Sequence, residues 1–309
     1  MRTFGIIVGV IMAAHTLGYL VTRRLLPRER EHLRPTGRLV DVDGRKVHAV
    51  ALGDGNETVV LLAGAGVPLP SAAFGPLMRL LATRFTVACS EELGTGHSDT
   101  TAAPRTNENL THEIRTALSH AGLTPPYVLM PHSASGITSE YYATQHPDEV
   151  SAIIMLDTTS SAVETARVPP FVDQFAKVPQ MTGGGRVVNR VVVPRLLRTE
   201  RGYTAREIGD YRTFMNQPLN DTVIDQNIRF PDNIHEVMQL KFPDTIPVLK
   251  LVPTGTLKRM GDDYQRDHLQ RLGPNATYQV VEGSHFVHHT NARRILDTTI
   301  DLLQHRQRT

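Results

Sequence analysis

The sequence predicts an α/β fold in which helices cover both faces of a mostly parallel sheet. Short apolar runs, typical of buried strands, alternate with segments of helical periodicity that are about ten to fifteen residues long. A parallel sheet buries both faces, so its strands are apolar along their whole length rather than at every second residue. The chain has 309 residues, of which 40% are hydrophobic and 21% charged, which is enough apolar material for a large core.

Composition argues against several classes of protein. The formal net charge is +2, and no basic stripe interleaves with aromatic residues, so nucleic acid is not an expected partner. The single cysteine, Cys89, excludes an intramolecular disulfide and reads as a buried structural thiol. His285, His288 and His289 cluster without the carboxylates or cysteines of a metal site. We therefore expect neither a metal nor a cofactor.

The N-terminal stretch has a different character. Residues 4–21 carry no charge, and Arg23, Arg24 and further arginines follow them. At about 1.5 Å per residue, this run just reaches the roughly 30 Å of a hydrocarbon core. We expect residues 1–24 to be a single-pass membrane anchor; a cleaved signal peptide and a buried amphipathic helix are the alternatives. The side of the membrane on which the following domain lies is open.

Residues 25–37 are charged and proline-punctuated, and they are interpreted as a linker to a domain over residues 38–309. Arg38–Leu52 alternates around Asp43-Gly44, which predicts a hairpin of two antiparallel strands. A strand over Thr58–Ala63 then leads directly into Gly64-Ala65-Gly66. Glycines directly after a strand suit a backbone that approaches a ligand closely.

The next segments continue the alternation. Ala73–Ala82 is expected to be a helix, Phe85–Cys89 a strand and residues 92–99 a turn-rich loop. Asn107–Ala121 is expected to be a helix whose first turn is capped by Thr106 or Asn107.

Tyr127–Asp157 is the most informative stretch. An apolar run over residues 127–130 leads into Pro-His-Ser-Ala-Ser-Gly, with Ser133 at its centre, and a helical pattern and a second apolar run follow. A strand that enters a helix through one sharp turn brings two backbones together, so the turn tolerates only small residues. The turn exposes the Ser133 hydroxyl, and the backbone N–H of Ala134 faces the place where negative charge would develop.

The order breaks after Asp157. Residues 160–243 contain helical patches and many prolines but no clear strand, which indicates a helical cap inserted between two core strands. The alternation resumes with a strand at Ile246–Val252, a helix near Asp262–Leu272 and a strand at Thr277–Val281. A closing helix over residues 291–303 follows Gly283-Ser284-His285-Phe286.

Taken together, residues 38–303 resemble the α/β-hydrolase superfamily. The turn around Ser133 is similar to the nucleophile motif G-x-S-x-G, although Pro131 and Ser135 stand where that motif has glycine. The resemblance implies that Ser133 is the nucleophile and that His285, just after the last strand, is the base. It also implies that the backbone N–H groups of Ala65 and Ala134 form an oxyanion hole.

The acid of the expected triad is left open by the sequence. The family usually places it in the loop after the Ile246–Val252 strand, but Thr254 and Thr256 occupy the first polar positions there. Asp157, at the end of the strand beside the Ser133 strand, is one candidate. Asp262 or Asp263, further along the loop, is the other.

A serine at this position implies a serine hydrolase that acts on a small-molecule acyl substrate, an ester or else a thioester or amide. Family members that attack with an aspartate cleave other bonds, and here that residue is absent. The alternative is a catalytically silent, membrane-tethered binding protein of the same fold, which the departures at Pro131 and Ser135 would suit.

Overall fold

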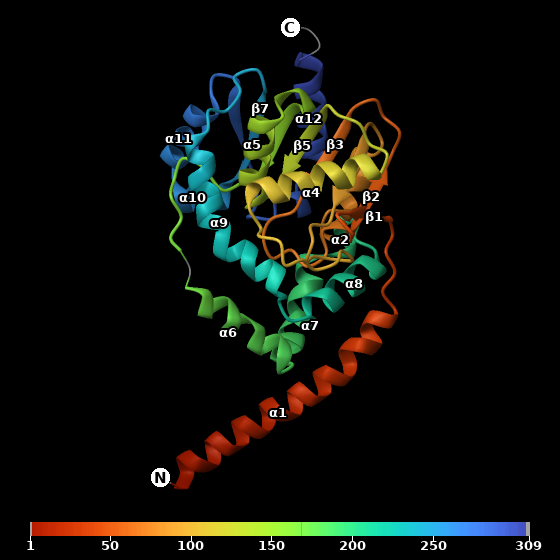
Figure 1. The fold of residues 1–309 in the computed structure, drawn as a ribbon, viewed down its shortest axis with the longest axis vertical. Coiled ribbons are helices and arrows are strands. Elements are labelled where there is room, and N and C mark those ends of the chain that lie inside the picture. The colour runs from red at the N-terminus through yellow and green to blue at the C-terminus, as the bar shows by residue number, and fades with distance from the viewer. Residues whose placement is uncertain (1, 168, 307–309) are drawn as a thin grey trace.

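The computed structural model describes residues 2–167 and 169–306, in which eight strands form one sheet in the order β1-β2-β4-β3-β5-β6-β7-β8 (Figure 1). The strands are β1 (Arg38–Val42), β2 (Arg45–Leu52), β3 (Thr58–Leu62), β4 (Thr86–Ser90), β5 (Tyr127–Pro131), β6 (Val150–Leu156), β7 (Val248–Pro253) and β8 (Ala276–Val281). The pairs β1–β2 and β2–β4 are antiparallel and the others parallel. The predicted fold class and opening hairpin are therefore confirmed.

Helices cover both faces of the sheet. The helices are α1 (Arg2–Glu31), α2 (Pro70–Ala73), α3 (Gly75–Leu81), α4 (Asn107–His120), α5 (Ser135–Gln145), α6 (Pro170–Met181), α7 (Gly184–Leu196), α8 (Ala205–Met215), α9 (Asp221–Gln239), α10 (Thr254–Met260), α11 (Asp262–Leu272) and α12 (Ala292–Arg306). Short 3-10 segments are η1 (Pro147–Glu149), η2 (Thr199–Arg201) and η3 (Val287–His289).

Alternation along the central strands divides the core into two layers. Leu61 of β3 belongs to a cluster with residues of α3 and α12, whereas its neighbour Leu62 belongs to a cluster with residues of α4 and α5. All these side chains are almost fully buried, which explains why β3 is apolar at each position after Thr58. The two layers fix the sheet between its helices and leave its strand ends free to carry polar groups.

A buried polar network lies on the α5 side of the sheet. Lys250 on β7 donates to His268 Nδ1 (2.6 Å), and His268 Nε2 donates to Glu140 on α5 (2.8 Å). Ser161 and Arg271 lie against the other oxygen of Glu140. Burial lowers the pKa of Lys250 to about 8. This network ties α5, the helix that follows Ser133, to β7 and to α11.

Helices α6, α7, α8 and α9 lie in the segment between β6 and β7, on the side of the sheet where Figure 1 shows them below the strands. Helix α9 contacts α5 and helix α8 contacts α2, so the insertion rests on the core at two places. The division at residues 160–243 stays a prediction, but the helical character of this segment agrees with it.

The N-terminal helix α1 extends away from the core and contacts α6 (Figure 1). A Cβ at Gly18 would overlap the carbonyl oxygen of Thr182, and Arg186 binds Glu29 (2.6 Å). Residues 25–31, expected as linker, are helical and continue α1 through Pro27. The segment that connects helix and domain is therefore shorter than the sequence indicates.

The expected membrane-spanning anchor over residues 1–24 is not supported. Within the described residues, no helix combines the length and the apolarity that crossing a bilayer requires. Met1 lies outside the described residues, as do the side chains of the first turns of α1.

Candidate active site

Ser133 lies in a strained turn between β5 and α5. Its backbone φ is 59°, in the left-handed region that L-residues seldom adopt. The Ser133 N–H donates to Leu156 O (3.2 Å) and its carbonyl accepts from Thr159 N–H (3.1 Å), so the end of β6 holds the turn in place. A Cβ at Gly64 would lie 2.7 Å from Ser133 Cβ. The glycine turn after β3 is therefore required for the close approach of the two segments.

The two departures from the nucleophile motif have local explanations. Ser135 is buried, and its hydroxyl lies 2.8 Å from the carbonyl of Leu62 and 3.0 Å from the N–H of His132. At this position the motif has a glycine, whereas here the Ser135 side chain makes hydrogen bonds to the backbone of the turn and of β3. Pro131 ends β5 opposite Leu62, and the N–H of His132 then donates to Leu62 O (2.9 Å). The strand pairing is continued by His132 despite the missing donor of the proline.

His285 lies between Ser133 and Asp157. Its Nε2 is 2.9 Å from Ser133 Oγ, and its Nδ1 is 2.7 Å from Asp157 Oδ2. Because a carboxylate only accepts, Nδ1 carries the proton and Nε2 is left to accept from the hydroxyl. The Asp157 side chain is 4% exposed and that of His285 is 38% exposed. The structure thus brings His285 into contact with Ser133 and Asp157, both of which lie more than a hundred residues before it in the sequence.

Asp157 follows directly on β6, at a backbone φ of 48°. Its N–H donates to Leu251 O of β7 (3.0 Å), and Thr256 Oγ1 donates to the same Oδ2 that faces His285 (2.8 Å). Thr256 belongs to α10, which begins immediately after β7 where the sequence indicates a loop. The strand that usually supplies the acid therefore supplies a hydrogen-bond donor to Asp157.

The alternative acids lie elsewhere. Asp262 begins α11, and its carboxylate binds Arg266 (2.5 Å) and the hydroxyl of Tyr278. Asp263 is exposed in the first turn of the same helix, a position that favours negative charge. Neither carboxylate makes a hydrogen bond to His285 in the described part of the chain.

A group of buried histidines, which the sequence analysis did not assign to the site, surrounds His285. His132 Nε2 donates to the carbonyl of His285 (3.0 Å), and its ring lies 4.7 Å from that of His285 and 4.8 Å from that of His288. Burial lowers the pKa of His132 to about 4 and that of His289 to about 3, so both are neutral at pH 7. Among the described residues, no group of His, Cys, Asp and Glu has the arrangement of a metal site. The signals in the sequence are His132 beside Ser133 and the clustering of His288 and His289 after His285.

Ala65 and Ala134 line one small cavity under helix α9, together with Gln226 and Asn233 of that helix. The two alanines thus line the same space, and their role as an oxyanion hole stays a prediction. A second cavity of about 570 Å³ also borders the glycine turn. Its wall includes Gly66, the loop over residues 94–100 and residues 214–220 of the insertion. A volume of this size is ordinary for a small-molecule site.

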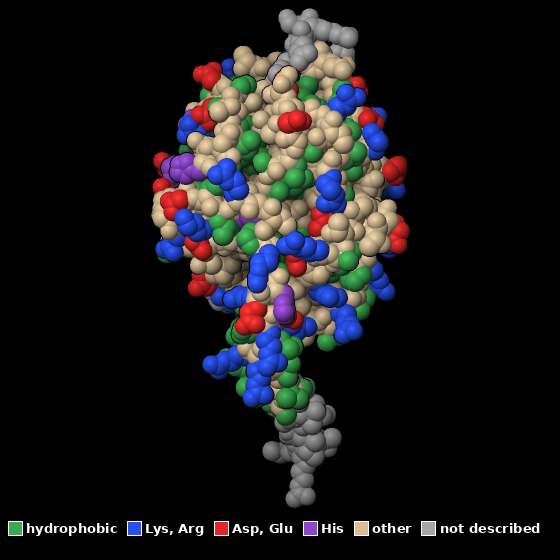
Figure 2. Space-filling model, turned by 90° about the vertical axis from the view of Figure 1, so that its right-hand side faces the viewer, with side chains coloured by type: hydrophobic (Ala, Val, Ile, Leu, Met, Phe, Trp, Pro, Cys, Tyr) green, Lys and Arg blue, Asp and Glu red, His purple; other side chains and the backbone are tan. Residues whose placement is uncertain are grey.

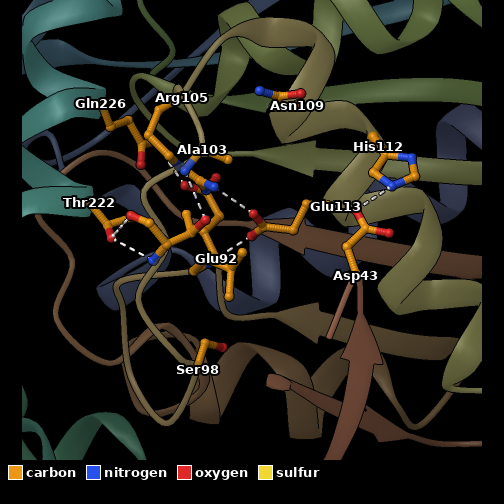
Figure 3. Close-up of polar contacts among 12 residues, drawn as sticks. Asp43, Glu92, Ser98, Ala103, Arg105, Asn109, His112, Glu113, Thr222 and Gln226 are labelled. Carbon is orange, nitrogen blue, oxygen red and sulfur yellow. Dashed lines mark hydrogen bonds and ion pairs between the residues drawn. The ribbon is translucent and has the colours of Figure 1, made fainter. Parts of the chain in front are cut away.

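Helix α9 is held over the core by a buried network of charged groups (Figure 3). Gln226 of α9 donates to Glu92 (2.7 Å), and Arg105 donates to Glu113 (2.6 Å), whose other oxygen accepts from Leu93 N–H. Burial raises the pKa of Glu92. Because an unpaired charge here would be costly, this network fixes α9 above the cavity at Ala65 and Ala134.

Comparison with known proteins agrees with this architecture. Residues 58–184 match the family model described as alpha/beta hydrolase fold. The uncharacterized protein YbdG of Bacillus subtilis (strain 168) is 35% identical over 132 residues, which are 43% of this chain and 41% of that protein. YqjL of the same organism is 26% identical over 117 residues, 38% and 46% of the two chains. The matched stretches thus span less than half of these curated relatives.

Solved structures are similar over most of their length. Cfl2 of Burkholderia cenocepacia superposes with a TM-score of 0.70 at 19% identity, over 87% of this chain and 97% of that one. An enol-lactonase of Burkholderia xenovorans LB400 superposes with a TM-score of 0.59 at 20% identity, over 86% of this chain and 100% of that one. A thermophilic esterase of Thermogutta terrifontis superposes with a TM-score of 0.57 at 17% identity, over 86% of this chain and 96% of that one. The chain has the α/β-hydrolase fold, as predicted.

The contact between Thr256 and Asp157 gives a first prediction. Thr256→Val keeps the shape of the side chain and removes a hydrogen bond to a buried carboxylate, which contributes about 1.5–3 kcal/mol. We expect Thr256→Val to lower the free energy of unfolding, measured in urea, by about that amount. Thr254→Val, at the start of the same helix but bonded to Glu282, is the matched control. Equal effects of the two substitutions would argue against a role of Thr256 at Asp157.

The lowered pKa of His132 predicts a pH dependence of stability. The unfolded chain takes up a proton at this residue near pH 6.5, but the folded protein only near pH 4. Stability is therefore lost as the pH falls from 6.5 to 4, by about 3 kcal/mol from this residue. His132→Gln lacks this titrating group. Between pH 6.5 and pH 4, its free energy of unfolding, measured in urea, should therefore fall by about 3 kcal/mol less than that of wild type. The exposed His112→Gln variant should follow wild type, and parallel curves for all three would contradict the assignment.

Proposed function

We propose that the protein is a serine hydrolase that cleaves carboxylic esters, and in the same way thioesters or amides, through Ser133, His285 and Asp157. The observation that carries the proposal is the continuous hydrogen-bonded path from Asp157 Oδ2 to His285 Nδ1 and from His285 Nε2 to Ser133 Oγ. Both distances lie within hydrogen-bond reach, as nucleophilic catalysis requires. The fold adds support, because Ser133 and His285 occupy the positions at which this architecture holds its nucleophile and base, while Asp157 lies one strand before the usual place of the acid.

In the first half of the reaction, His285 Nε2 takes the proton of the Ser133 hydroxyl while Oγ forms a bond to the substrate carbonyl carbon. The carbonyl oxygen becomes negatively charged and accepts hydrogen bonds from the N–H groups of Ala65 and Ala134. The bond to the alcohol then breaks, and His285 gives its proton to the leaving oxygen. The product of this half is an acyl group on Ser133.

In the second half, water replaces the alcohol. His285 takes a proton from water, whose oxygen attacks the acyl carbon, and the acid leaves as Ser133 Oγ recovers the proton. Asp157 stays ionised throughout. It holds the His285 ring in the tautomer that leaves Nε2 free to accept, and it stabilises the imidazolium that forms in each half.

Two further observations support this class of reaction. The described part of the chain offers a neutral hydroxyl rather than a carboxylate at the turn after β5, which suits acyl transfer rather than attack by an aspartate. Two proteins with a similar fold carry the names enol-lactonase and esterase. Their identity to this chain is low, so the reaction is proposed from the side chains themselves.

A labelled fluorophosphonate tests the nucleophile. Wild type is expected to become labelled at Ser133, because the reagent needs a serine activated by a neighbouring base. Ser133→Ala should not be labelled, whereas Ser135→Ala, which removes the other hydroxyl of the turn, should keep the label if it folds. A folded wild-type protein that fails to react would favour the catalytically silent binding protein instead.

The identity of the acid is tested separately with p-nitrophenyl esters of increasing chain length. Asp157→Asn should lower kcat by about 10⁴-fold, because the amide stabilises the wrong tautomer of His285 and carries no charge. Asp262→Asn and Asp263→Asn should each stay within about twofold of wild type. Mild and equal effects of all three would remove Asp157 from the proposed mechanism.

A further inference from the structure

Exposed apolar side chains concentrate on three helices that contact one another. Among the described residues, fourteen of the eighteen large apolar side chains with the highest exposure lie on α1, α6 and α7. Those on α6 and α7 are Val172, Phe175, Val178, Met181, Val187, Val188, Val191 and Val192; those on α1 are Met12, Leu17, Tyr19, Leu20, Val21 and Leu25. We call this surface the basic apolar face. Exposed apolar residues that gather in this way mark an interaction surface, whereas scattered ones do not.

The exposure is large at individual positions. Val187 is 72% and Val188 57% exposed, while Val193, on the opposite side of α7, is fully buried in the core. Helix α7 thus presents apolar side chains on its outer side as well as on its inner side. Packing against the rest of the chain accounts only for the inner side.

The same helices carry a net positive charge. Residues 12–31 and 170–198 contain nine Lys and Arg but three Asp and Glu, a net charge of +6, whereas the whole chain carries +2. The remainder of the chain is therefore net negative. Six exposed arginines of this face make no ion pair with a described residue: Arg23, Arg24, Arg28, Arg190, Arg195 and Arg198. They are available to an external anion.

The apolar side chains and the arginines lie on one continuous surface, because α1, α6 and α7 lie next to one another. Figure 1 shows α6 and α7 at the end of the insertion that points away from the sheet, with α1 running beside them. Figure 2 shows apolar and basic side chains together on the part of α1 that leaves the body of the protein. Gly18 lies against Thr182, and Glu29 binds Arg186, so α1 and the hairpin of α6 and α7 are joined.

We propose that the basic apolar face lies on the surface of a bilayer that contains anionic phospholipid. The apolar side chains enter the boundary between headgroups and acyl chains, and the arginines extend to the phosphates above it. The helices lie in the plane of the bilayer. This goes beyond the proposed hydrolase activity and does not depend on it.

A second copy of the chain is the other occupant that an apolar face could have. A contact between two such faces would bring together two surfaces of net charge +6, and like charges oppose association. An anionic lipid surface instead complements the charge and covers the apolar side chains at the same time. The charge therefore favours lipid over self-association.

Flotation with vesicles tests the proposal on the full chain. We expect wild type to float with vesicles of phosphatidylcholine and 30% phosphatidylglycerol, and at least tenfold less with phosphatidylcholine alone or at high salt. Val187→Asp combined with Val191→Asp should reduce binding at least tenfold. Leu39→Asp combined with Val280→Asp changes two similarly exposed residues outside the face and is the matched control.

The arginines are tested in the same assay. Arg190→Gln combined with Arg195→Gln should lower binding to the anionic vesicles by about fivefold for each charge removed. Arg84→Gln combined with Arg293→Gln, two exposed arginines elsewhere, should leave it unchanged. Thermal unfolding confirms that each variant is folded. Equal binding of wild type and the Val187 and Val191 variant would overturn the proposal, as would dimerisation of wild type without binding to either vesicle.

Discussion

The close approach of two turns, the glycine turn after β3 and the turn around Ser133, is the constraint on which the site depends. Two neighbouring parallel strands end at the same edge of the sheet, and their turns meet there. Gly64 has no side chain to hold them apart, and Ser133 accepts a left-handed backbone so that its hydroxyl rises above the sheet. The strain is held by hydrogen bonds from the adjacent end of β6. Without this contact, Ala65 and Ala134 would not line one cavity.

The polar partners of Ser133 are organised along the same edge. Asp157 follows β6, Thr256 follows β7 and His285 follows β8, so successive strands place a carboxylate, a hydroxyl and an imidazole side by side. Parallel strands lie about 4.8 Å apart, so side chains at the ends of adjacent strands lie close to one another.

The insertion is attached to the core and to α1 by different kinds of contact. On the inner side, buried charges such as Glu92 and Arg105 fix α9 over the glycine turn. On the outer side, α6 and α7 expose valines and unpaired arginines next to α1. The inner contacts are buried hydrogen bonds and an ion pair, whereas the outer surface combines apolar area with positive charge. The site and the proposed lipid surface are therefore on opposite sides of one helical layer.

The sequence by itself determined the fold class, the order of strands and helices and the position of Ser133 in its turn, because apolar periodicity and small turn residues are local signals. It also predicted His285 and the two alanines by resemblance. The sequence could not choose among Asp157, Asp262 and Asp263, nor anticipate α10, because that choice depends on which strands become neighbours and on where Thr256 then points. The same is true of the N-terminus. An uncharged run predicts a membrane anchor, but the contacts of α1 with α6 exist only in the folded chain, where side chains distant in sequence decide what an apolar helix packs against.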